Sequence, residues 1–101
     1  MESTIQSINL ISVDPTIRKG RPCIAGTSIE VSVVVVAKIV HGLEPDEIAA
    51  DYGLSLAQVY AALAYYYENK QAIDASIHER RQLAQRMKDQ RVGSHHTPLF
   101  R

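Results

Sequence analysis

The segment of residues 43–69, LEPDEIAADYGLSLAQVYAALAYYYEN, constrains the fold most, because its pattern is that of two helices joined by a tight turn. Pro45 opens the first helix, since proline is favoured at the first helical position, where its missing N–H costs nothing. Gly53 ends that helix, because glycine tolerates the left-handed conformation of a helix cap. Ser55 caps the second helix, and Gln58, three residues later, completes a capping box. The segment therefore predicts a helix-turn-helix.

The second predicted helix, residues 55–69, would enter the major groove if this were a DNA-binding protein. Helices that read bases usually present Arg, Lys, Asn or Gln, yet this segment has neither Arg nor Lys. Its candidates for contact with DNA are polar and uncharged: Ser55, Gln58 and Asn69. The alternative is a helical hairpin used for packing or dimerisation, because tyrosines outside the core suit an interface that is partly wet.

A further helix is predicted before this segment. Residues 31–40 are rich in β-branched side chains, which favours a strand by propensity. However, Ser32 can cap a helix, and the apolar residues that follow fall on helical stripes. We therefore expect a mainly α fold whose tri-helical core consists of residues 32–40, 45–52 and 55–69.

A short β element is predicted near the N-terminus. Residues 8–13 have the branched, apolar character of a strand, which Pro15 ends because proline cannot continue a ladder. Residues 21–24 could form a short extended segment, and residues 27–31 alternate toward a second strand. A two-stranded ribbon is marginal alone, so it must lie on the helices or on another copy of the chain.

Basic side chains gather in the loop between the two predicted strands. Arg18, Lys19 and Arg21 lie around Gly20, and Gly20 and Gly26 permit backbone conformations that are closed to other residues. A loop of this kind could hold a phosphate, although it lacks the GxxxxGKS spacing of a nucleotide-binding loop. We identify the three basic residues as candidates for contact with a DNA backbone. The alternative is a rigid turn with solvated charges.

Taken together, these pieces resemble a known family. The segment GRPCIAGT at residues 20–27, then Ile29 and Val31, then HGLEPDEIAADYGLSLAQVYAALAYYYEN resemble domain-of-unknown-function family 433, over roughly residues 8–74. That family comprises small bacterial proteins, many classed as antitoxin-like. The resemblance implies a helix-turn-helix core of homeodomain-like or winged type with a short N-terminal β element. The chain departs from the family at Ser28, where the family usually has arginine.

The resemblance also implies a VapB-like antitoxin, encoded beside a PIN-like ribonuclease toxin with an acidic, metal-binding active site. Antitoxins of this kind bind their toxin and often repress their own operon. The chain would then have the toxin as its main partner and operator DNA as a second one.

The last part of the chain, residues 75–101, is predicted to be a basic helical extension of a domain formed by residues 1–74, with a disordered tail from Gly93. Residues 72–91 have a helical pattern whose apolar stripe is too narrow for a core, and such a helix suits a groove on a partner. Its arginines could pair with the acidic site of a PIN-like toxin. The alternative is a solvated extension or a dimer arm. The candidate partner-binding residues are Ile77, Arg80, Arg81, Leu83, Arg86, Met87 and Arg91.

No catalytic constellation is present, so we do not expect an enzyme. Cys23 is the only cysteine, which excludes an internal disulfide and a cysteine-based zinc motif. The histidines lack ligand spacing, and the pair His95-His96 is weak support for a metal. We therefore predict no metal site and no cofactor. No apolar run approaches the ~20 residues that cross a bilayer, and no signal-peptide pattern is present, which predicts a cytoplasmic protein without membrane contact.

The sequence thus favours an antitoxin-like protein of a type II toxin–antitoxin system. We expect a homodimer that binds and inhibits a PIN-like ribonuclease, with repression of its own operon through DNA binding as a second role. Two alternatives stay open. One is a helix-turn-helix transcriptional regulator without a toxin, and the other is a dimeric structural adaptor.

Overall fold

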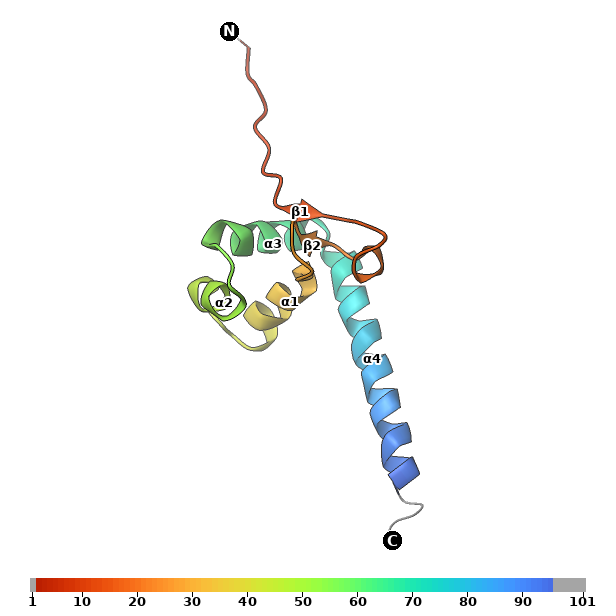
Figure 1. Cartoon of the computed structure of the whole chain (residues 1–101). Coiled ribbons are helices and arrows are strands. Elements are labelled where there is room, and N and C mark those ends of the chain that lie inside the picture. The colour runs from red at the N-terminus through yellow and green to blue at the C-terminus, as the bar shows by residue number, and fades with distance from the viewer. Residues whose placement is uncertain (1, 96–101) are drawn as a thin grey trace. The chain divides into compact units, whose positions relative to one another are not determined.

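The computed structural model describes residues 2–95, and side chains as far as residue 90 (Figure 1). The chain divides into two compact units, one ending at Asn69 and the other beginning at Lys70, a little before the boundary that we predicted after residue 74. The fold is mainly α with a short N-terminal β element, which confirms the predicted class. Within the described part of the chain, no helix is long and apolar enough to cross a membrane.

The β element consists of β1 (Ile11–Ser12) and β2 (Cys23–Ile24), which pair antiparallel with Ile11 opposite Ile24. The first strand is shorter than the predicted residues 8–13. The extended segment predicted at residues 21–24 is confirmed in part, since it contains β2. The strand predicted at residues 27–31 was wrong, because residue 30 joins β2 only through an isolated bridge to Cys23. Gly26, at φ +79°, turns the chain immediately after β2, so the following residues fold back along the other edge of β2.

The β-branched run forms a helix, as predicted. It begins as α1 (Val31–Val35) and continues as the π-helical turn η2 (Val36–Val40), where the His41 N–H donates to the Val36 carbonyl at 3.1 Å. Burial overrides the strand propensity, because the valines of α1 pack into the core. Ser32 is not the cap that we expected: Glu30 occupies the N-cap position, and Ser32 lies inside the helix.

The helix-turn-helix consists of α2 (Pro45–Tyr52) and α3 (Leu56–Glu68), joined through Gly53. Gly53 adopts the left-handed cap at φ +67°, as predicted. The capping box of α3 is also confirmed, since Ser55 Oγ accepts from the Gln58 N–H at 3.1 Å and Gln58 Oε1 accepts from the Ser55 N–H at 2.8 Å. These features are local in sequence, so the turn between the two helices could be predicted without knowledge of the tertiary structure.

The core of the first unit lies between α1, α2 and α3, with β1 in contact with α3 (Figure 1). Its fully buried side chains come from β2, α1, α2 and α3, and the burial of each contributes about 1.5–3 kcal/mol to stability. The largest of them are Ile24, Ile48, Val31, Val34 and Val59.

The second unit contains α4 (Lys70–His95), which includes and extends the predicted helix at residues 72–91. Disorder was predicted from Gly93, but α4 continues to His95 because no proline interrupts its hydrogen bonding before that residue. The rest of the predicted tail, residues 96–101, lies outside the described residues. Lys70 pairs with Asp74 at 2.9 Å one turn along the helix. From residue 81 to residue 90 every side chain is exposed.

The basic loop contains a short turn, η1 (Arg18–Gly20), in the left-handed region. Arg18 and Lys19 have φ angles of +49° and +56°, which cost non-glycine residues about 1–2 kcal/mol each. Backbone bonds hold the turn from both sides, since Gly20 N–H donates to the Ile17 carbonyl at 3.0 Å and Arg21 N–H to the Arg18 carbonyl at 3.1 Å.

Replacing Lys19 by glycine should therefore stabilise the protein. Glycine adopts the left-handed conformation without the steric cost that lysine has. It also has more conformational entropy in the unfolded chain, which offsets part of this stabilisation, so the expected increase in unfolding free energy is about 0.5–1 kcal/mol. Urea unfolding monitored by circular dichroism measures it. Lys19→Ala removes the same charge and keeps the Cβ atom, so it should give no such gain. Equal stability of the two variants would show that strain at residue 19 is not the cause.

Candidate functional site

The basic loop is tied to the start of α1 by a bidentate ion pair. Arg21 donates from Nε to Glu30 Oε1 at 3.0 Å and from an Nη to Glu30 Oε2 at 3.2 Å. The Glu30 side chain is only 7% exposed and that of Arg21 is 32% exposed. Ser32 Oγ adds a third bond to Glu30 Oε1 at 3.1 Å. A buried carboxylate needs such partners, because leaving it unpaired away from water is costly.

This ion pair gives Arg21 a structural task that the sequence did not suggest. We named Arg21 as a candidate for DNA contact, and the structure places its guanidinium against Glu30. Glu30 itself received no role from the sequence. The available signal was an acidic residue directly before a helix rich in valine, where a carboxylate must find a partner to be buried.

The other two basic residues of the loop, Arg18 and Lys19, are exposed. Arg18 Nε donates to the Ser28 carbonyl at 3.0 Å, and this bond fixes the side chain along the loop. Arg18 also borders an open pocket of about 260 Å³ together with Ser28, Ile29, Glu30, Val33 and Tyr52. That volume lies below the range usual for cofactor pockets. The loop thus presents two cations to solvent, and Arg18 is held in place.

The three polar candidates on α3 serve the ends of the helix. Ser55 and Gln58 form the capping box, which uses the Gln58 carbonyl oxygen and leaves its NH₂ group as a donor. Asn69 is the C-cap, and its side-chain NH₂ donates to the Tyr65 carbonyl at 3.0 Å. These residues bond at the two ends of α3, whereas Arg18 bonds to Ser28 within the basic loop. Their role in DNA contact stays a prediction.

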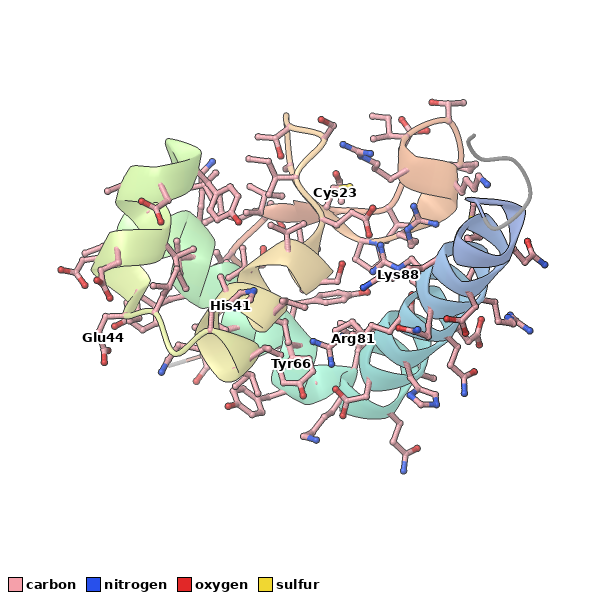
Figure 2. The ribbon with its side chains drawn as sticks, turned by 90° about the horizontal axis from the view of Figure 1, so that it is seen from below. Cys23, His41, Glu44, Tyr66, Arg81 and Lys88 are labelled. Carbon is pink, nitrogen blue, oxygen red and sulfur yellow. The ribbon has the colours of Figure 1, made fainter. Side chains whose placement is uncertain are left out.

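The outward face of α3 is apolar. Tyr66 is buried, with its ring 5.1 Å from that of Tyr67, whereas Tyr67 and Tyr60 are 63% and 56% exposed. Figure 2 shows Tyr66 at the C-terminal part of α3. The sequence predicted that only part of the tyrosine run would be core, and this is confirmed.

The partner-binding candidates on α4 differ in exposure along the helix. Ile77 and Arg80 are half-buried, whereas Arg81 and Arg86 are exposed. Leu83 and Met87, four residues apart and therefore on one face, are 50% and 59% exposed. Figure 2 shows the side chains of Arg81 and Lys88 extending from this helix. Arg91 belongs to α4, and its side chain lies outside the described part.

Cys23 is buried in β2 and donates from Sγ to the Arg21 carbonyl at 3.4 Å. Burial raises the pKa of the Cys23 thiol, and the neighbouring Glu30 charge raises it further. Figure 2 shows Cys23 and His41 at separate places, on β2 and after η2. Among the described residues, no group of three or more His, Cys, Asp or Glu side chains could hold a metal ion.

Comparison with known proteins finds one family and one solved relative. The model of the family described as protein of unknown function (DUF433) matches residues 11–66. The crystal structure of a DUF433 member protein from Anabaena variabilis ATCC 29413 is similar, with a TM-score of 0.61 and 34% sequence identity. That similarity covers 68% of each chain. No curated protein sequence matches.

Removing the cation of the buried pair should destabilise the fold. Arg21→Met leaves Glu30 without its bidentate partner, and we expect a loss of about 2–3 kcal/mol, below the 3–5 kcal/mol of a wholly buried pair because Arg21 is about a third exposed. Urea unfolding measures the loss. Lys19→Met also replaces a cation of this loop by methionine, but no carboxylate depends on it, so it should leave stability nearly unchanged. Equal unfolding free energies for Arg21→Met and Lys19→Met would show that the ion pair does not stabilise the fold.

The Cys23 thiol should resist modification in the folded protein. Because burial keeps the thiol protonated, alkylation by iodoacetamide should be at least ~100-fold slower than in urea. The raised pKa also makes stability fall as pH rises past the ordinary thiol pKa, since only the unfolded chain then releases the proton. Cys23→Ala should remove that part of the alkaline decline. Fast labelling of the folded protein would contradict the burial.

Proposed function

The chain belongs to the DUF433 family of proteins of unknown function, and we propose that this member is an antitoxin-like protein that binds and inhibits a PIN-like ribonuclease. The observation that supports the proposal best is the exposed surface of α4, where Leu83 and Met87 are at least half exposed with Arg86 next to them and Arg81 exposed on another side of the helix. A helix with apolar side chains one turn apart and cations around them suits a groove on another protein.

The two kinds of side chain would contribute differently. Leu83 and Met87 supply apolar area, and methionine adapts to an irregular surface because its side chain is flexible. Arg81 and Arg86 supply planar guanidinium groups, which bind carboxylates in a bidentate manner. In a nuclease whose active site holds metal through carboxylates, an arginine seated on those carboxylates would take the place of the metal and stop cleavage.

Reading of DNA by α3 receives less support from the same structure. Across α3 the only charged residue is Glu68, and the amide oxygen of Gln58 is used in the capping box. The regulator alternative would depend on Arg18 and Lys19, which are exposed and could contact phosphates. Contacts of that kind are not sequence-specific and weaken with salt.

The proposal requires a PIN-like nuclease encoded beside this chain, and binding to that nuclease, measured by calorimetry and by inhibition of RNA cleavage, tests it. Arg86→Glu should weaken binding at least ~10-fold, since it places a carboxylate against an acidic site. Lys19→Glu is the matched control: it makes the same change of charge on an exposed residue of the first unit and should leave binding unchanged.

The apolar pair gives a second test. Leu83→Asn together with Met87→Asn should also reduce affinity at least ~10-fold while the helical circular dichroism is kept, because both side chains are exposed. A nuclease that binds all these variants equally well would exclude α4 as the binding surface. Binding of operator DNA with no binding of a nuclease would favour the regulator alternative.

A further inference from the structure

A small open pocket in the first unit combines a cation with apolar walls. It has a volume of about 260 Å³ and is formed by the basic loop, the turn after β2, α1 and the end of α2. The residues that line it are Arg18, Ser28, Ile29, Glu30, Val33 and Tyr52. All of them belong to the first unit. The pocket is therefore independent of the proposed binding surface on α4.

The walls of the pocket are mostly apolar. Ile29 and Val33 are half-buried, so part of each aliphatic side chain stays accessible in the pocket. Tyr52 is 41% exposed and adds an aromatic ring. An apolar cavity of about 150 Å³ is large enough to bind benzene. This pocket, which is larger, therefore has room for one ring or one branched alkyl group together with a small polar group.

Arg18 supplies the cation of the pocket, and its position is fixed. Its Nε atom donates to the Ser28 carbonyl at 3.0 Å. Its backbone has a left-handed φ of +49°, and the Arg21 N–H donates to its carbonyl at 3.1 Å. Because Nε uses only one of the guanidinium N–H groups, those on the two terminal nitrogens remain for a ligand. An arginine that is oriented before binding loses less side-chain freedom when the ligand arrives.

The acidic residue of the pocket is already engaged. Both carboxylate oxygens of Glu30 accept from Arg21, and Oε1 also accepts from Ser32. From residue 14 to residue 30 the chain contains three cations and two carboxylates. This segment therefore carries a net positive charge, which favours an anionic ligand over a cationic one.

We propose that this pocket binds a small free carboxylic acid, whose carboxylate pairs with Arg18 and whose aromatic ring or branched alkyl group lies against the apolar walls. A carboxylate matches the planar fork of guanidinium donors. The apolar group gains by leaving water, and inorganic phosphate has no such group. The inference depends on the first unit alone and does not rest on the proposed function of α4.

Titration of the full-length protein with phenylacetate, followed through the amide signals in two-dimensional NMR, tests the proposal. A ligand of about ten non-hydrogen atoms makes few contacts, so its Kd should be about 0.1–1 mM. The shifts should saturate and should be largest for Ser28, Ile29, Val33 and Tyr52, which line the pocket.

Two further probes, used at the same ionic strength, separate the charge from the apolar group. Phenylacetamide has the shape of phenylacetate without its charge, and it should bind at least ~10-fold more weakly because it loses the charge-assisted bonds to Arg18. Inorganic phosphate has the charge without the ring. It should also bind at least ~10-fold more weakly, because it covers none of the apolar walls.

Variants of the pocket give the matching test on the protein. Arg18→Met should raise the Kd for phenylacetate at least ~10-fold. Lys19→Met is the matched control: it removes the neighbouring cation, which does not line the pocket, and should change Kd less than ~3-fold. Val33→Phe fills the pocket and should abolish saturable binding while circular dichroism shows an unchanged helix content. Arg18 is exposed, so Arg18→Met should keep the fold and decides the question even if Val33→Phe unfolds.

Four results would contradict the proposal. Equal affinity for phenylacetamide and phenylacetate would show that the carboxylate is not recognised, and unchanged binding by Arg18→Met would show that this arginine does not hold it. Phosphate that binds as tightly as phenylacetate, and is lost in Arg18→Met, would assign Arg18 to phosphate contact, as the regulator alternative requires. Shifts that spread over the surface without saturation would show that the pocket does not bind acids of this class.

Discussion

The bidentate pair between Arg21 and Glu30 is the interaction on which the first unit depends. It joins the basic loop, which comes before β2, to the residue that caps α1, and Ser32 Oγ also donates to the carboxylate. β2 lies between these two points and pairs with β1 on one edge. Without the cation, the chain would carry a buried negative charge at the start of its most apolar helix. The pair therefore sets where the β element meets the helices.

The exposed surfaces of α3 and α4 are the ones on which our proposals about partners depend. α3 combines two capped ends with exposed Leu56, Tyr60 and Tyr67, and α4 presents Leu83 and Met87 among arginines. Helix α3 has neither Lys nor Arg, which are the residues that bind a phosphate backbone. A helix-turn-helix is a backbone motif, and its function depends on what its exposed side chains can bind. In this chain, those of α3 are tyrosine, leucine and alanine, with Glu68 at the last position of the helix.

Much of the helical fold could be predicted from the sequence, because its signals are local. The helix ends are marked by local features: Pro45 stands at the first position of α2, and Gly53 forms its left-handed cap. Ser55 and Gln58 form the capping box of α3. The candidate site was harder to predict. Arg21 was assigned to solvent or DNA because its partner Glu30 is nine residues away, and no local pattern shows that two such side chains will meet. Two extended segments were predicted, at residues 21–24 and 27–31, and the sequence could not show that the first one pairs with β1, since this pairing is a contact between distant segments.

By itself, the sequence determined the mainly α class, the ends of α2 and α3, and the helical character of the last part of the chain. These depend on residue spacing and backbone preference, which act over one or two turns. Only the tertiary structure decided which valines of α1 are buried, that Arg21 serves a buried carboxylate, and that Tyr66 packs inward while Tyr60 and Tyr67 stay outside. Burial and pairing of this kind arise between segments, so they exist only once the helices have packed.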